Sequence, residues 1–194
     1  MGKVILDISM SLDGFVARPD DDPGPIHGWL FNGDTVDPES NLFKTAGAST
    51  QVLNEDLKTA GAMVVGRRTY DLTGGWGGNQ PLSDAPVFVV THAPPETVPA
   101  GHTSFTFVEG VAAAVEQARH AAGDKDVSIV GGATVARQCL VAGLLDEMQI
   151  HLTPVLLGRG VRLIDDLGGH EISLVQTRVL EAPGVTHLRY RVHA

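Results

Sequence analysis

The chain is poor in cysteine and in positive charge, and both shortages exclude classes of function. Cys139 is the single cysteine, so no disulfide can form within the chain, and we predict a cytoplasmic protein. A formal net charge of −9 argues against nucleic acid or an anionic membrane as the main partner. No apolar run has the length of a membrane span, and the N-terminus lacks a signal-peptide pattern. We therefore expect a soluble protein that binds a small molecule.

Several motifs that identify a particular reaction or cofactor are also missing. No G-x-G-x-x-G follows a predicted strand, no lysine ends a glycine-rich phosphate loop, and no G-x-S-x-G nucleophile elbow occurs. The eight histidines lie scattered, without H-E-x-x-H or Cys/His spacing, so we predict no metal site. A chain without an obvious nucleophile or metal suits hydride transfer, in which a cofactor carries the chemistry.

Short apolar runs alternate along the chain with segments of helical periodicity. The runs predict strands over Val4–Met10, Met63–Val65, Val87–Val90, Phe105–Val108, Val127–Val130 and Glu147–Leu157, and a hairpin of Ile172–Glu181 with Thr186–His193. Helices are predicted over Ser49–Ala60, capped by Ser49 or Thr50, and over Thr69–Leu72, Val111–Ala122 and Val135–Ala142. The chain shows no repeat or linker, so we predict one α/β domain over residues 1–194, with a mainly parallel sheet and an antiparallel C-terminal hairpin.

One predicted strand ends at a glycine pair that leads directly into a helix. Val127–Val130 stops at Gly131 and Gly132, and the helical segment follows. The N-terminus of a helix offers free backbone N–H groups to a phosphate, and glycines let a ligand approach the main chain closely. The alternative is that the pair forms only a turn.

A second segment repeats this arrangement and adds positive charge. The strand before Gly66 is followed by a helix start that carries Arg67 and Arg68. Cations in the first turn oppose the helix dipole, so a bound anion would explain them. The alternative is that both guanidinium groups point into solvent. Two such corners in one chain predict two phosphates or one pyrophosphate.

Four motifs occur in a familiar order. They are Ser-Leu-Asp-Gly at 11–14, Val-Val-Gly-Arg-Arg-Thr-Tyr at 64–70, Val-Gly-Gly-Ala-Thr-Val at 130–135, and the run from Leu144 to Gly160. Together they resemble the dihydrofolate reductase-like three-layer fold over essentially the whole chain. The resemblance is to the branch that contains the C-terminal reductase domain of the bifunctional riboflavin-biosynthesis deaminase/reductase.

This resemblance implies a bound NADPH, a mobile lid over Arg18–Phe31 and a cis peptide within the glycine pair. The planar guanidinium of Arg67 or Arg68, with Thr91 and His92, would meet the 2′-phosphate and favour NADPH over NADH. The other residues carried over from the family would hold the pyrophosphate or line the nicotinamide. They are Gly66, Thr69, Gly131, Gly132, Ala133, Thr134 and Val135 for the phosphates, and Ser9, Val16 and Ala17 for the nicotinamide. Within the lid, the run Asp20-Asp21-Asp22 predicts a solvated loop tip.

One position departs from the dihydrofolate reductases, in which a carboxylate early in the second helix grips the pterin. The corresponding position lies close to Thr50, and Glu55 and Asp56 lie more than a turn further along. Asp7 is the replacement that we predict, either binding the substrate or relaying a proton to the atom beside the hydride acceptor. The alternative is a buried aspartate tied to a backbone N–H. Asp13 is predicted to fix its turn.

The expected function is an NADPH-dependent reductase of a small heterocyclic or carbonyl/imine substrate. One alternative is the riboflavin-pathway 5-amino-6-(5-phosphoribosylamino)uracil reductase, with Arg159 or Arg162 as a second anion site unless both are solvated loop charges. A nucleotide-binding module without catalysis is another, and a different redox cofactor in the same cleft is a third. Relatives in the riboflavin branch often pair, so the resemblance also implies a homodimer.

Overall fold

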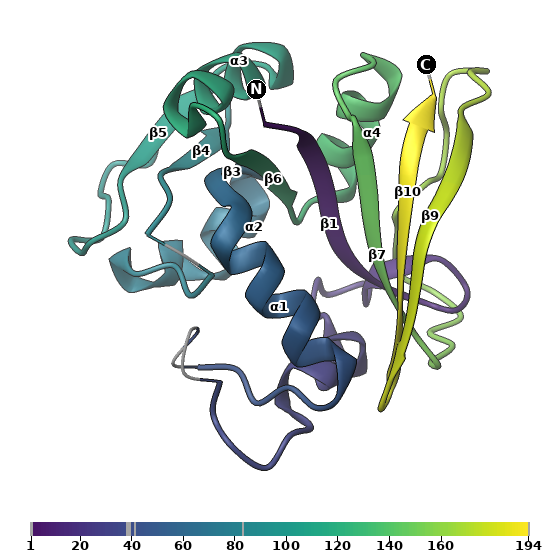
Figure 1. The fold of residues 1–194 in the computed structure, drawn as a ribbon. Helices are drawn as coiled ribbons and strands as arrows, with labels where there is room; N and C mark the ends of the chain where they lie inside the picture. The colour runs from purple at the N-terminus through teal and green to yellow at the C-terminus, as the bar shows by residue number, and fades with distance from the viewer. Residues whose placement is uncertain (1, 38–39, 41, 83, 194) are drawn as a thin grey trace.

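An eight-stranded sheet runs through the computed structural model, which describes residues 2–37, 40, 42–82 and 84–193. Its order is β5-β4-β3-β6-β1-β7-β10-β9, with β1 in the middle (Figure 1). Neighbouring strands from β5 to β7 are parallel, β10 is antiparallel to β7, and β9 is antiparallel to β10. The strands are β1 (Val4–Ser11), β3 (Ala60–Gly66), β4 (Val87–Val90), β5 (Phe105–Val108), β6 (Asp126–Val130), β7 (Glu147–Thr153), β9 (Ser173–Ala182) and β10 (Val185–His193). The predicted mainly parallel α/β sheet with an antiparallel hairpin is confirmed.

Helices cover both faces of this sheet and make three layers. On one face α3 and α4 bury alanine, valine and Cys139 against Leu6, Val64 and Ile129. The opposite face carries α1 and α2, and Tyr70 of α2 packs there against Val65 and its neighbours. The helices are α1 (Ala48–Thr59), α2 (Arg67–Leu72), α3 (Val111–Ala122) and α4 (Ala133–Val141), with 3-10 turns η1 (Gly24–Phe31) and η2 (Gly74–Gly78). Among the described residues, no helix has the length and apolarity needed to span a membrane.

Several predicted boundaries are wrong for local reasons. Gly47 precedes α1, so neither Ser49 nor Thr50 is the N-cap, and the side chain of Ser49 is buried instead. The strand predicted to reach Leu157 ends at Thr153, because Pro154 has no N–H for the ladder. Two short strands, β2 (Phe15–Ala17) and β8 (Val161–Arg162), were not predicted and form a separate two-stranded sheet.

Candidate active site

A cavity of about 870 Å³ lies at the carboxyl ends of the parallel strands, where an α/β sheet usually binds its ligand. Every site residue predicted from the sequence lines this cavity. They are Asp7, Ser9, Val16, Ala17, Gly66, Arg67, Arg68, Thr69, Thr91, His92, Gly131, Gly132, Ala133, Thr134 and Val135. The fold therefore brings together residues that are spread over most of the sequence.

The two strand–glycine–helix corners pack directly against each other in the lining of this cavity. The φ angles of Gly131 and Gly132 are +75° and +87°, a region that favours glycine. A Cβ atom on Gly131 would lie 2.9 Å from Cγ2 of Thr69, and one on Gly66 would lie 3.2 Å from Cγ2 of Val135. Glycine at these positions therefore lets the two corners approach each other closely. The cis peptide expected within the pair is absent, since the peptide between Gly131 and Gly132 is trans.

Both arginines of the second corner already have protein partners. Arg67 donates from Nε to Asp71 at 2.8 Å and also binds the carbonyl of Ala93. Arg68 forms an ion pair with Asp21 of the Arg18–Phe31 segment, although its side chain is 75% exposed. Asp21 has a φ of +65° and a side chain only 11% exposed, so the predicted solvated tip is wrong at this position. A carboxylate thus binds Arg68, as the predicted anion would.

The segment predicted as a lid is folded down onto the cavity. Within η1 the side chains of Ile26 and Trp29 are buried. The indole N–H of Trp29 donates to Oγ of Ser9 at 3.0 Å, and its ring centroid lies 4.6 Å from that of His151. The segment thus packs onto the cavity, whereas its movement as a lid stays a prediction.

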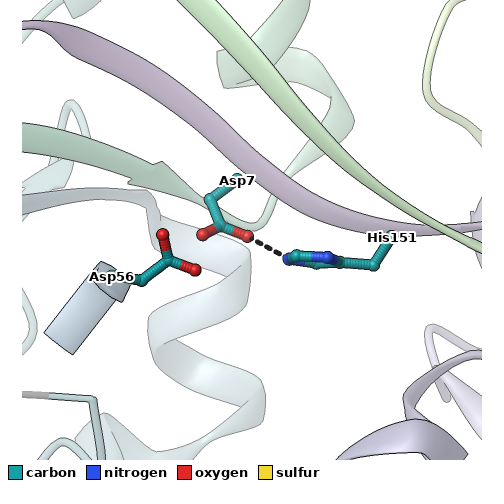
Figure 2. A group of neighbouring side chains, drawn as sticks. All are labelled: Asp7, Asp56 and His151. Atoms are coloured by element: carbon teal, nitrogen blue, oxygen red, sulfur yellow. Dashed lines mark hydrogen bonds and ion pairs between the residues drawn. The ribbon is translucent and has the colours of Figure 1, made fainter. Parts of the chain in front are cut away.

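Strand register aligns the polar side chains of the site. On β1 and β7, Asp7 pairs with Gln149 and Ser9 pairs with His151. Next to them β10 continues the second row by pairing His187 with His151. Nε2 of His151 lies 2.8 Å from Oδ1 of Asp7 (Figure 2). The amide of Gln149 donates to Oδ2 of Asp7 at 3.3 Å. Side chains, rather than the backbone N–H of the alternative prediction, hold the carboxylate of Asp7.

Asp56 belongs to this site, which the sequence analysis did not foresee. Helix α1 places Asp56 beside Asp7 (Figure 2). Oδ2 of Asp56 accepts an N–H of the Gln149 amide at 2.7 Å. The resemblance to the dihydrofolate reductases instead places the corresponding position close to Thr50, more than a turn earlier. The available signal was helical periodicity, since Val52 and Asp56 lie four residues apart on the face that α1 buries.

The pKa values of the two carboxyl groups are shifted in opposite directions. Burial, followed by repulsion from Asp7, raises the pKa of Asp56 well above its usual value. Burial also acts to raise the pKa of Asp7, but the charge and hydrogen bond of His151 outweigh it and leave that pKa lowered. The pair therefore favours the protonation state in which Asp7 is ionised and Asp56 keeps its proton.

Asp7, Asp56 and His151 also have the donor types of a metal site, which the sequence did not indicate. One donor atom from each lies within 4.8 Å of the others. The three side chains already have hydrogen-bond partners within the group, since His151 contacts Asp7 and Gln149 contacts both carboxyl groups. We therefore interpret the group as a hydrogen-bonded proton site.

Two residues outside the pair have structural roles, and that of Asp13 is the one predicted for it. Cys139 is fully buried, and burial raises the pKa of its thiol to about 11, so it is a core residue. Asp13 fixes its turn through Ser11 at 2.6 Å and holds the Leu157–Gly158 backbone. The Ser11 hydrogen bond in particular lowers the pKa of Asp13 to about 2, although its burial opposes the shift.

Comparison with known proteins identifies the family. The sequence profile of the RibD C-terminal domain matches residues 2–187. The chain belongs to the RibD C-terminal domain family. This RibD C-terminal domain is 28% identical over 167 residues to the uncharacterised Bacillus subtilis (strain 168) protein YwjB, covering 85% of this chain and 84% of that protein.

Solved structures show the same fold. The RibD C-terminal domain described here aligns with a Shewanella sp. PV-4 protein for which a role in riboflavin biosynthesis has been suggested, over 99% of both chains, with a TM-score of 0.74 and 24% identity. It also aligns with a Thermotoga maritima diaminohydroxyphosphoribosylaminopyrimidine deaminase/5-amino-6-(5-phosphoribosylamino)uracil reductase, with a TM-score of 0.63 and 14% identity. That alignment covers 98% of this chain and 56% of the Thermotoga chain. The predicted dihydrofolate reductase-like fold is confirmed.

Proposed function

We propose that this protein is an NADPH-dependent reductase of a small heterocyclic or carbonyl/imine substrate. One observation carries the proposal: a single cavity contains both strand–glycine–helix corners and a carboxylate pair with opposite pKa shifts. Membership in the RibD C-terminal domain family supports a reductase-type role. The direct test is oxidation of NADPH, followed at 340 nm, with 5-amino-6-(5-phosphoribosylamino)uracil and with a panel of carbonyl and imine compounds.

The residues present fit this cofactor, and phosphate binding and proton supply belong to two different parts of the cavity. Gly66, Thr69, Gly131 and Gly132 would hold the phosphates, and Arg68 would meet the charge at their edge. The nicotinamide supplies a hydride when NADPH is bound. The protein must then add a proton to the atom beside the hydride acceptor.

Asp56 is the group able to supply that proton. It remains protonated at a pH where ordinary aspartates are ionised, as a general acid requires. Asp7 stays ionised beside it and keeps the pKa of Asp56 high through repulsion. Asp7, which the sequence indicated as the proton relay, thus acts as the charged partner of the acid. Trp29 closes the cavity and excludes water from the reacting atoms.

Replacing Arg68 is expected to weaken NADPH more than NADH. Arg68→Ala removes a charge-assisted contact to phosphate worth about 1.5–3 kcal/mol, which corresponds to a loss of about 10- to 100-fold in NADPH affinity. NADH, which has no 2′-phosphate, should lose less. Nicotinamide fluorescence titrations of both nucleotides measure the two dissociation constants.

Arg159→Ala is the matched control, because it removes the same charge from an exposed residue that is absent from the described cavity lining. It should leave both affinities within about two-fold of wild type. Equal losses of NADPH and NADH in Arg68→Ala would show that Arg68 does not select the 2′-phosphate.

The dependence of kcat/KM on pH should show two limbs. Activity should rise with pH as Asp7 ionises, below the ordinary aspartate pKa, and should fall at higher pH as Asp56 loses its proton. In Asp7→Asn the acid limb should disappear. The alkaline limb should move to lower pH, because the repulsion that raises the pKa of Asp56 is gone. Wild-type turnover and an unshifted profile in Asp7→Asn, with normal NADPH binding, would remove Asp7 from the mechanism.

Two alternative functions lead to different results in the same assay. The riboflavin-pathway substrate carries a phosphate, yet Arg162 stacks on Phe15 and neither it nor Arg159 is among the described cavity-lining residues. A preference for that substrate would therefore require another anion-binding site. A nucleotide-binding module would bind NADPH but would not oxidise it, whichever substrate is added. Such a module has no need for the proton site formed by Asp7 and Asp56.

A further inference from the structure

A line of hydrogen bonds leads from the carboxylate pair away from the cavity. Nε2 of His151 contacts Oδ1 of Asp7 at 2.8 Å. Nδ1 of His151 lies 2.7 Å from Nδ1 of His187, and Nε2 of His187 lies 2.9 Å from Oγ of Ser49 on α1. His151, His187 and Ser49 are all buried, so each polar atom along this line needs the partner that it has.

The chemistry of imidazole limits where the protons can lie. One of the two Nδ1 atoms must donate and the other must accept. Burial, followed by repulsion from His151, lowers the pKa of His187 to about 4, so His187 is neutral at neutral pH. If His151 is neutral with its proton on Nε2, His187 donates to it and Ser49 donates to His187. When His151 is protonated on both nitrogens, its Nδ1 donates to Nδ1 of His187, and Nε2 of His187 donates to the hydroxyl of Ser49. The bond from Nε2 of His151 to Asp7 keeps its direction.

An ionised Asp7 can only accept, so in both arrangements His151 carries a proton on the nitrogen that faces Asp7. We propose that His187 is a positioning residue for the reduction, because its Nδ1 gives the far nitrogen of His151 the partner that it needs while Nε2–H points at Asp7. Asp7 is thereby fixed as the ionised member of the pair, and Asp56 keeps the proton that the substrate receives. This role in the reaction rests on the proposed reductase function.

Other groups around the two imidazoles do not replace this contact. The ring of Trp29 packs against both histidines, but its N–H donates to Ser9. His27 of η1 acts on His151, and Arg178 of β9 acts on His187, through charge alone. Among the described residues, His187 is therefore the side chain that partners Nδ1 of His151.

The test follows the side-chain carboxyl ¹³C resonances of Asp7 and Asp56 across pH in the full chain, without NADPH or substrate. His187→Phe is expected to raise the pH at which Asp7 titrates by about one unit. The reason is that the Nδ1–H of protonated His151 then loses its acceptor, which weakens the charged ring that lowers the pKa of Asp7. His187→Asn keeps an amide near the position of Nδ1 and should restore a titration close to that of wild type.

Nitrogen-15 spectra of the wild-type histidines give a second readout, in which His151 should be protonated at Nε2. Protonation at Nδ1 alone, or an unchanged Asp7 titration in folded His187→Phe, overturns the proposal. If His187→Phe does not fold, Ser49→Ala replaces it: a smaller upward shift supports the proposal and no shift overturns it. NADPH oxidation is measured separately, so a failure of the reductase function is distinguishable from a failure of the His187 role.

Discussion

Asp56→Asn is expected to lower kcat by about 10²- to 10⁴-fold at neutral pH, the usual contribution of a general acid. The asparagine keeps an oxygen for the bond from Gln149 but has no acidic proton. Its effect on NADPH affinity should be small, within about two-fold, because the phosphate corners lie on other elements of the cavity. Steady-state kinetics and nucleotide titrations on the same preparation separate the two quantities.

Glu55→Gln is the matched control for this experiment. Glu55 precedes Asp56 on α1, but it pairs with Arg178 of β9, and the described cavity lining does not include it. Its replacement removes an acid from the same helix and should leave kcat close to wild type. A comparable loss in both variants would mean that α1 requires its acidic residues for folding and not for proton transfer.

Trp29→Ala is expected to lower the free energy of unfolding by about 3–5 kcal/mol, as for other buried tryptophans. The side chain of Trp29 is 5% exposed, packs against two imidazoles and donates to Ser9, so its loss leaves a void and a buried hydroxyl without its donor. Turnover should fall as well, because the Arg18–Phe31 segment loses its main anchor over the cavity. Urea unfolding monitored by circular dichroism gives the stability.

Phe31→Ala tests an aromatic residue of the same segment that is 55% exposed. Phe31 contacts Phe43 with ring centroids 5.8 Å apart, and its loss should cost within about 1 kcal/mol. Trp29→Phe should fall between the two alanine variants, since it keeps a ring and loses the N–H. Equal stability losses in Trp29→Ala and Phe31→Ala would contradict a segment anchored at Trp29.

The sheet was predictable because its strands are short apolar runs bounded by glycine, and the helix Val111–Ala122 was predicted to the residue. Predictions from short stretches of sequence were wrong where tertiary contacts determine the role of a residue. Ser49 has the chemistry of an N-cap, yet its hydroxyl is used by His187 from a strand near the other end of the chain. No pattern within a short window could indicate that partner.

The site was predictable where glycine marks a corner and was missed where register brings residues together. His151 and His187 meet because β10 pairs with β7, and neither histidine has a sequence neighbour that suggests a pair. Asp56 meets Asp7 because α1 crosses the sheet, a geometry that the spacing of residues along the chain does not contain. Asp21 could not be distinguished from its acidic neighbours until the fold placed it beside Arg68.

The central position of β1 has a consequence for how the chain is made. Strands β3, β4 and β5 are neighbours in both sequence and space and can pair early. β1 emerges first, but Val4 pairs with Val127 and Ile5 with Glu147. At about 5–20 residues per second, about 6–25 s of translation separate β1 from β6. The nascent chain must therefore keep an apolar strand unpaired until β6 arrives to join it to β3, and a ribosome that stalls before β6 leaves β1 without a place in the sheet.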